Sequence, residues 1–286
     1  MQRTVRRILP GDYDDVVALL RRDIVQTAFL LGALHADVSR YEWYGLYENT
    51  RLAAVLAAGG VSGVYVPDSA NLHHFGDTLQ KLTASSMVFG NEAALRHLLP
   101  LLPVRGTVRP QYLPHTVYSI TSDGFRPSVH DHHVARAGAA QENELAHLFL
   151  AGLQEAYGGL TGDDVVHGVR AAVHRAIAEG LVWSVEWDGD VVAAAYVQSV
   201  TTDSALLLGT VTKEEYRSRG VGTAVLEGVT SELLSRTARV LLPLSPHQAV
   251  LGNVAAALGY RSVGDGAVLI VAEDVREPSA GYPRLG

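Results

Sequence analysis

A short basic segment with two glycines, at residues 217–222, has the residue types and spacing that could do chemistry. It reads Arg-Ser-Arg-Gly-Val-Gly, follows an apolar run at 205–211 and precedes a helix-like run at 223–234. A helix begins with backbone N–H groups that have no intrahelical partner, and glycines let that backbone approach a ligand closely. These groups and the helix dipole together favour a phosphate. The segment therefore predicts a cradle for a diphosphate between a strand and a helix.

Two common phosphate-binding motifs do not describe this segment. Gly220 and Gly222 are not followed by the third glycine of G-x-G-x-x-G, and the sequence has no Gly-Lys-Ser/Thr. The segment instead resembles motif A of the GCN5-related N-acetyltransferases, R/Q-x-x-G-x-G/A, which lies between the fourth strand and the third helix of that fold. Arg217, Gly220 and Gly222 match its defined positions. The alternative interpretation is a tight surface turn with two solvated arginines.

The resemblance implies that acetyl-coenzyme A binds at this segment through its diphosphate and leaves as coenzyme A. In the family, backbone groups of the fourth strand hold the thioester, and the pantetheine arm inserts between that strand and the fifth. One of the two arginines is expected near a phosphate, the other near solvent, Glu214 or Glu215. Thr223 is expected either as a phosphate ligand or as the helix N-cap. The expected cofactor-binding residues are Thr210, Val211, Thr212, Arg217, Ser218, Arg219, Gly220, Val221, Gly222 and Thr223.

The residues for proton transfer depart from the family's pattern. Many members carry N-x-x-A-x-x-x-Y-x-x-x-G-F after the fifth strand, and that tyrosine protonates the departing thiolate. Matching residues 258–260 to the closing positions puts Ala255 at the tyrosine position, and alanine cannot act as an acid. Ser245 and His247 follow the expected strand 240–244 and are candidates to replace it. Solvent as the acid, or loss of turnover, are the alternatives.

Candidates for a general base lie in the expected loop between the first two helices of the second half. Glu155 and Tyr157 fall in this glycine-rich stretch, and Glu155 is the candidate base or acceptor contact. Glu186, on an expected strand, is a further candidate. Glu155 is alternatively a solvated carboxylate at a helix end. Tyr216 is expected to be a packing residue.

The run His130-Asp131-His132-His133 has four possible metal ligands in a row. Alternate side chains of an extended chain point to opposite sides, so four consecutive ligands make a poor site. We expect an exposed polar connector there and no metal.

The composition limits the classes of function. A formal net charge of -7 and a pI near 5.9 argue against a dedicated nucleic-acid binder. The chain has no cysteine, which excludes disulfides and cysteine nucleophiles. The most apolar run, residues 52–66, is short and broken by glycines, and residues 1–8 resemble no signal peptide. We expect a soluble cytoplasmic protein, a monomer or homodimer, without nucleic-acid or membrane partners.

The expected elements repeat one order along the chain. From residue 134 the patterns predict strand, two helices, three strands, helix, strand, helix and strand, with Asp-Gly at 188–189 marking a hairpin. Residues 12–99 carry a looser version, with helices at 75–82 and 91–99, the second capped by Asn91. Prolines between residues 100 and 127 indicate a crossover between the two halves.

The fold class is therefore α/β (α+β), with tandem acetyltransferase folds, each a mixed, mostly antiparallel twisted sheet flanked by helices. The expected domains are residues 1–128, a degenerate N-terminal acetyltransferase-like domain, residues 129–276, the domain that binds acetyl-coenzyme A, and a tail at 277–286. The first half lacks the arginine and paired glycines, with Gly90 alone in the corresponding place. We expect it to bind no coenzyme A and to complete the acceptor cleft or support the second half.

The predicted function is an acyl-coenzyme A-dependent N-acetyltransferase. It would transfer acetyl from acetyl-coenzyme A to a primary amine of a small molecule or protein by direct attack. The alternative, suggested by Ala255 and the degraded first half, is a coenzyme A-binding sensor or partner module without turnover.

Overall fold

The described strands of the protein form one mixed sheet. The computed structural model describes residues 2–84, 87–102, 110–128, 130, 132–157 and 163–270. Twelve strands follow the order β1-β2-β3-β4-β5-β12-β6-β11-β10-β9-β8-β7. Among these described strands, the β4–β5 and β10–β11 pairs are parallel and the other neighbours antiparallel. The predicted class, a mostly antiparallel sheet flanked by helices, is confirmed.

The first half of the chain builds one side of this sheet. Its elements are β1 (Arg3–Arg7), α1 (Tyr13–Leu20), α2 (Ile24–Ala36), β2 (Glu42–Glu48), β3 (Arg51–Ala58), β4 (Val61–Tyr65), β5 (Met87–Gly90) and α3 (Glu92–Leu98). The expected helix at 75–82 is instead part of a 3₁₀ stretch, Ser69–Ala84, broken at Gly76 by a φ of 46°. Asn91 does stand at the N-cap of α3, but its side chain makes no capping hydrogen bond.

From β7 onward the second half follows the predicted order, and β6, which precedes it in the sequence, is an additional strand. Its elements are β6 (Gln111–Ile120), β7 (Val134–Arg136), α4 (Glu142–Tyr157), α5 (Asp163–Ala178), β8 (Val182–Trp187), β9 (Asp190–Val200), β10 (Ala205–Thr212), α6 (Val221–Leu234), β11 (Val240–Leu244), α7 (Ala249–Leu258) and β12 (Arg261–Ile270). Asp188 and Gly189 adopt φ of 54° and 89° in the β8–β9 turn. Tight hairpin turns need positive φ at both central residues, which explains the Asp-Gly pair.

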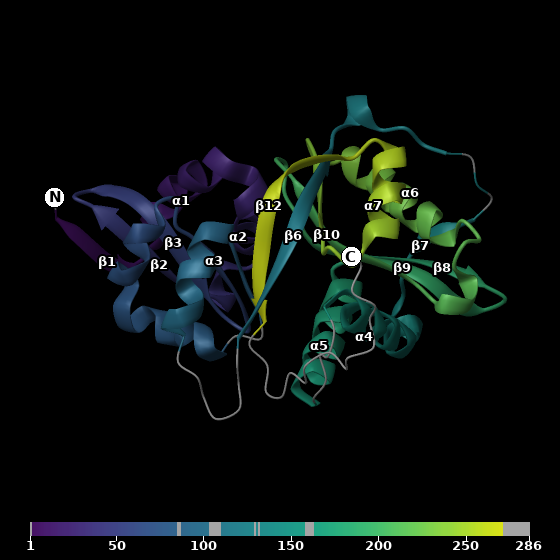
Figure 1. Ribbon diagram of the computed structural model, residues 1–286, viewed down its shortest axis with the longest axis horizontal. Coiled ribbons are helices and arrows are strands. Elements are labelled where there is room, and N and C mark those ends of the chain that lie inside the picture. Colours follow the sequence, from purple (N-terminus) through teal and green to yellow (C-terminus); the bar gives the residue numbers. More distant parts are fainter. Residues whose placement is uncertain are drawn as a thin grey trace, which may run out of the picture.

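The two halves share strands at the centre of the sheet. β6 lies between β11 and β12, and β12 in turn pairs with β5 of the first half, so Ile270 lies opposite Met87. Figure 1 shows β6 and β12 side by side between the halves. The sheet is therefore continuous across the proposed boundary at residues 128 and 129, and that boundary stays a prediction.

Helices cover both faces of the sheet. Leu207 of β10 packs in one core with α6 and α7, whereas its neighbour Leu206 packs on the opposite face with α1 and α2. Adjacent residues of a strand point to opposite faces, so α2 shares its face with α4 and α5 rather than with α6. Helix α2 reaches across to β9, where a Cβ on Gly32 would lie 2.1 Å from the Cβ of Ser199. This close packing of α2 on β9 joins the first half to the second.

Within the described part of the chain, the search for a helix of membrane-spanning length and hydropathy finds none.

Candidate cofactor and acyl-transfer site

The parallel strands β10 and β11 diverge soon after they begin. Ala205 and Leu206 lie opposite Val240 and Leu241, but from Leu207 onward β10 is in register only with β9 among the described strands. The β9–β10 register shifts twice, between Leu206 and Leu207 and again before Gly209. Such bulges bend a strand away from its neighbour. We call the divergence beyond Leu206 and Leu241 the β10–β11 fork.

Backbone groups of β10 become available along this fork. Thr210, Val211 and Thr212 lie beyond the divergence, paired with β9 on one edge. An edge without a strand partner presents N–H and C=O groups that an extended ligand can bind. These three residues therefore lie where the sequence places the backbone contacts to an acyl-thioester arm.

The glycine segment forms the turn into α6. Ser218 and Gly220 both have left-handed backbone conformations, with φ of 61° and 82°. Gly220 is the N-cap of α6, and the first helical hydrogen bond runs from the N–H of Ala224 to its carbonyl. The N–H groups of Val221, Gly222 and Thr223 precede that bond and have no intrahelical acceptor. Thr223 is thus inside the helix, and the expectation that it could be the N-cap is wrong.

Gly222 is required by the closeness of α6 to β10. A Cβ on this residue would lie 2.8 Å from Oγ1 of Thr212. The absence of a side chain brings the first turn of α6 against the last residue of β10, at the mouth of the fork. Val221 is fully buried in the core, so only its backbone is available to a ligand. The arrangement fits a diphosphate at the helix N-terminus with its attached chain leading into the fork.

The two arginines of the segment have different partners. The guanidinium of Arg217 forms an ion pair with Glu155, Nη2 to Oε2 at 2.5 Å. Arg219 lies over the rings of Tyr216 and Trp187, at 5.3 and 6.0 Å from their centroids. No ion pair between either arginine and Glu214 or Glu215 is found among the described residues. The Arg217 side chain is half-exposed and Arg219 is exposed, and both lie beside the turn.

The last turn of α4 bridges the two strands of the fork. Glu155 belongs to this helix, so its expected place in a loop is wrong. A Cβ on Gly152 would lie 2.9 Å from Cγ2 of Val211 on β10. On the β11 side, the hydroxyl of Ser245 donates to the carbonyl of Ala156 at 3.1 Å. The helix end therefore brings Glu155, Ser245 and the cofactor segment into one region. The side chain of Tyr157 and residues 158–162 lie outside the described part of the chain.

The remaining proton-transfer candidates are less favourably placed. Ser245 is buried, and its hydroxyl proton already has an acceptor. His247 is exposed in the turn before α7, and Glu186 accepts a hydrogen bond from Gln141 at 2.6 Å. Ala255 is fully buried in α7. Tyr260 is also buried, and its hydroxyl is bonded to that of Thr230 at 2.7 Å, which makes it a core residue.

No equivalent fork is found among the described strands of the first half. Strands β4 and β5 stay in register over four successive pairs, from Val61 with Met87 to Val64 with Gly90. Beyond them, the Asn91 side chain accepts from the N–H of Val66 and donates to its carbonyl, both at 3.1 Å. This amide closes the place where strands would otherwise separate, which explains why Asn91 does not cap α3.

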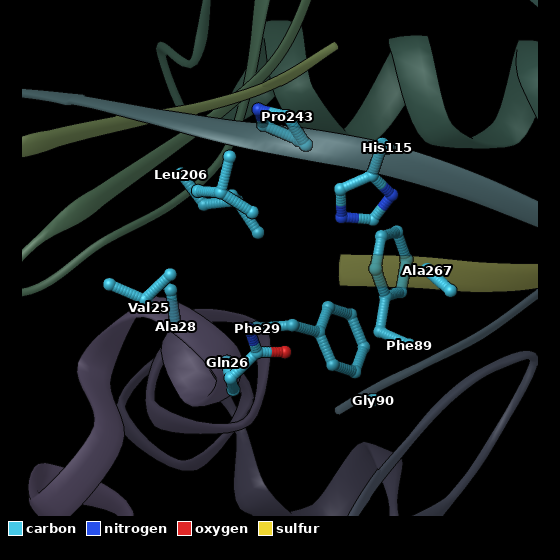
Figure 2. Close-up of a pocket in the computed structure, with 11 residues that line it drawn as sticks. Val25, Gln26, Ala28, Phe29, Phe89, Gly90, His115, Leu206, Pro243 and Ala267 are labelled. Atoms are coloured by element: carbon cyan, nitrogen blue, oxygen red, sulfur yellow. The ribbon is translucent and has the colours of Figure 1, made fainter. Parts of the chain in front are cut away.

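A small cavity of about 30 Å³ lies between α2 and the base of the fork. Figure 2 shows its lining, with Leu206 and Pro243 from the fork strands, His115 from β6 and Phe29 from α2. Such a volume holds one or two water molecules. Burial lowers the pKa of His115 to about 4, and its Nδ1 has no hydrogen-bond partner among the described residues. The imidazole is therefore neutral near pH 7.

Sequence reasoning missed His115 and also His132, whose Nε2 lies 3.0 Å from the carbonyl oxygen of Arg219. His115 lies in the proline-rich stretch where the sequence predicts a crossover between the halves, and His132 belongs to the run that the sequence predicts to be an exposed polar connector. Neither position has a local pattern that could have revealed its contact, because each partner is supplied by a distant segment.

Comparisons with known proteins agree with this geometry. No protein-family model matches the chain. No curated protein has a significantly similar sequence. Solved structures do match. An acetyltransferase of the GNAT (GCN5-related N-acetyltransferase) family from Colwellia psychrerythraea has a TM-score of 0.54 at 14% identity, covering 94% of this chain and 99% of the other.

Two further structures match over nearly the whole chain. A GCN5-related N-acetyltransferase from Sphaerobacter thermophilus has a TM-score of 0.57 at 15% identity, covering 93% and 94% of the two chains. A tandem GNAT protein from the clavulanic acid biosynthesis pathway has a TM-score of 0.51 at 12% identity, covering 96% and 100%. The chain therefore has the fold of the GCN5-related N-acetyltransferases, as the sequence predicted.

Proposed function

We propose that the protein is an acyl-coenzyme A-dependent N-acetyltransferase that moves acetyl from acetyl-coenzyme A to a primary amine of a small molecule or protein by direct attack. The observation that carries this proposal is the start of α6, where unpaired N–H groups meet the mouth of the β10–β11 fork. Bound acetyl-coenzyme A would supply an activated acyl thioester.

The residues of this chain supply binding and orientation for that reaction. The N–H groups of Val221, Gly222 and Thr223 would hold the diphosphate, with Arg217 or Arg219 adding positive charge. The free edge of β10 would orient the arm, and fixing the reacting groups in line lowers the entropic part of the barrier. Glu155, at the end of α4 and paired with Arg217, is the carboxylate that we propose to receive a proton from the amine.

We place the amine acceptor on the α2 side of the sheet. The cavity in Figure 2 lies beside Leu206 and Pro243, where the fork begins, and α2 forms its other wall. Its small volume suits the amine end of an acceptor and not a whole molecule. The first half would then serve as part of the acceptor wall, without a cofactor of its own.

A non-catalytic coenzyme A-binding module is the second candidate. Ala255 is buried where the resemblance expects an acidic tyrosine, the Ser245 proton has an acceptor, and Glu155 is paired with Arg217. A thiol-release assay with a broad panel of amines separates the two functions. Release supports the transferase, and firm cofactor binding without release supports the module.

Cofactor binding itself is tested by calorimetry and thermal unfolding with acetyl-coenzyme A. Ligand at a hundredfold excess over its dissociation constant should stabilise the fold by about 2.7 kcal/mol. The matched variants are Ser218→Asp and Ser218→Asn, because both residues tolerate the left-handed backbone that Ser218 adopts. Only the aspartate adds a negative charge beside the diphosphate, so it alone should weaken binding. No binding by the unmodified protein would refute the proposal.

A further inference from the structure

Two described residues of the connector between the halves, Ser128 and His130, contact α6. The buried carboxylate of Glu227 on that helix accepts from the N–H and the hydroxyl of Ser128, at 2.8 and 2.5 Å. Its other oxygen lies 3.5 Å from Nε2 of His130. A buried carboxylate needs such partners, because removing a charge from water is costly without them. Glu227 therefore anchors the connector to the helix that begins at the cofactor segment.

One further contact joins the connector to the cofactor turn itself. Nε2 of His132 lies 3.0 Å from the carbonyl oxygen of Arg219, so the imidazole N–H donates to it. The ring also packs at 5.7 Å from Trp187, and a Cβ on Gly220 would lie 3.6 Å from the same nitrogen. His132 thus contacts the backbone between the two left-handed residues.

That stretch of backbone is intrinsically unfavourable. Ser218 has a φ of 61°, a left-handed conformation that is unfavourable for a residue with a Cβ. Arg219 lies between Ser218 and Gly220, and its carbonyl belongs to the peptide that leads into the helix N-cap. A donor fixed from outside the turn restricts the orientation of this peptide plane. The orientation of the following N–H groups depends on it.

We propose that the connector braces the diphosphate-binding turn and that His132 is the positioning residue through which it acts. In the proposed complex His132 contacts no atom of the substrate. It holds the carbonyl of Arg219 so that the N–H groups after Gly220 stay aimed outward before the cofactor arrives. Its consequence for binding rests on the proposed function, but its effect on the turn does not.

The first test needs no ligand. Hydrogen–deuterium exchange is measured on residues 217–224 of the full chain in three variants. His132→Phe keeps a ring against Trp187 and removes the donor, His132→Gln keeps an N–H at similar reach, and His133→Phe changes the exposed neighbour. Of these three variants, we expect faster exchange only in His132→Phe. Ser128→Ala, which loosens the connector at Glu227, should show a smaller increase of the same kind and serves if His132→Phe fails to fold.

The second test measures the dissociation constant of coenzyme A by calorimetry. Loss of one positioning hydrogen bond should raise it about threefold to tenfold in His132→Phe. His132→Gln and His133→Phe should bind like the unmodified protein.

The proposal is wrong if His132→Phe leaves the exchange rate and the affinity unchanged. It is also wrong if His132→Gln changes them as much as His132→Phe does. If the unmodified protein binds no coenzyme A, the proposed function fails, and the exchange result still decides the brace.

Discussion

Arg217 has two possible anionic partners, Glu155 in the protein alone and a diphosphate in the proposed complex. The ion pair is half-exposed, with side-chain exposures of 46% and 58%. Pairs of this kind contribute about 0.2–1 kcal/mol. They are weak enough for a bound diphosphate to displace, so Glu155 and the cofactor would compete for one guanidinium.

Replacing Glu155 by glutamine tests this competition. The variant should bind coenzyme A more tightly, by up to about fivefold, because Arg217 is freed. Calorimetry of Glu155→Gln is compared with that of Glu214→Gln, because Glu214 is an exposed carboxylate just before the glycine segment and forms no ion pair with Arg217 among the described residues. The comparison separates loss of the ion pair from a general effect of removing negative charge. Equal gains in both variants would contradict the competition. A loss of turnover by a factor of about a hundred or more would identify Glu155 as the general base.

His115 should make stability depend on pH. Its pKa is about 4 when folded, below the ordinary value of 6.5, because burial disfavours the charged ring. As pH falls from 6.5 towards 4, the unfolded chain takes up a proton that the folded chain does not, so stability is lost in this window. Between pH 7.5 and 4.5 the loss due to this group should be roughly 2 to 3 kcal/mol.

Urea unfolding at both pH values measures this loss. His115→Gln should remove it, whereas His133→Gln, at an exposed histidine, should keep it. The groups that oppose the shift electrostatically are Asp265 and Glu92. An identical pH dependence in His115→Gln and the unmodified protein would show that His115 is not the cause.

At the scale of elements, α2 is held against β9 by the absence of a side chain on Gly32. Gly32→Ala should destabilise the protein by about 1–3 kcal/mol through overpacking, although alanine favours helices. The double variant Gly32→Ala, Ser199→Gly should recover part of the loss, because Ser199 supplies the colliding atoms. Denaturant unfolding of the single and double variants is the measurement. A single variant as stable as the unmodified protein would mean that the helix shifts freely and does not lock the halves.

At the scale of the whole molecule, β6 belongs to the sheet of the second half. It pairs with β11 on one edge and β12 on the other, so Val117 lies opposite both Pro243 and Gly264. A fragment that begins at residue 129 loses this strand and leaves β11 and β12 without their shared neighbour. A fragment that begins at residue 110 keeps it.

We therefore expect fragment 110–286 to be more soluble than 129–286 and to unfold cooperatively. Circular dichroism and size-exclusion chromatography of the two fragments compare them directly. Both fragments lack α2 and expose the sheet face that it covers. A difference in their folding is therefore due to the presence or absence of β6. Equal folding of 129–286 would support residue 128 as the end of an independent unit.

The sequence by itself determined the local features. The Asp-Gly turn, the helices and the glycine turn before α6 depend on residues close together in the chain, where spacing and turn chemistry decide the backbone. The element order of the second half and the family of folds followed from these signals. Two predictions from the same local signals were wrong. Residues 75–82 are not one regular helix, because the backbone is non-helical at Gly76. The Asn91 side chain does not cap α3, because it is hydrogen-bonded to the backbone of Val66.

Only the tertiary structure decided which distant segments meet. Three contacts join residues far apart in the sequence. At the centre of the sheet β12 pairs with both β5 and β6, Arg217 pairs with Glu155, and His132 contacts Arg219. Backbone hydrogen bonds and ion pairs have no sequence pattern that identifies a remote partner. Their formation depends on which faces pack together, and that is settled when the whole sheet assembles.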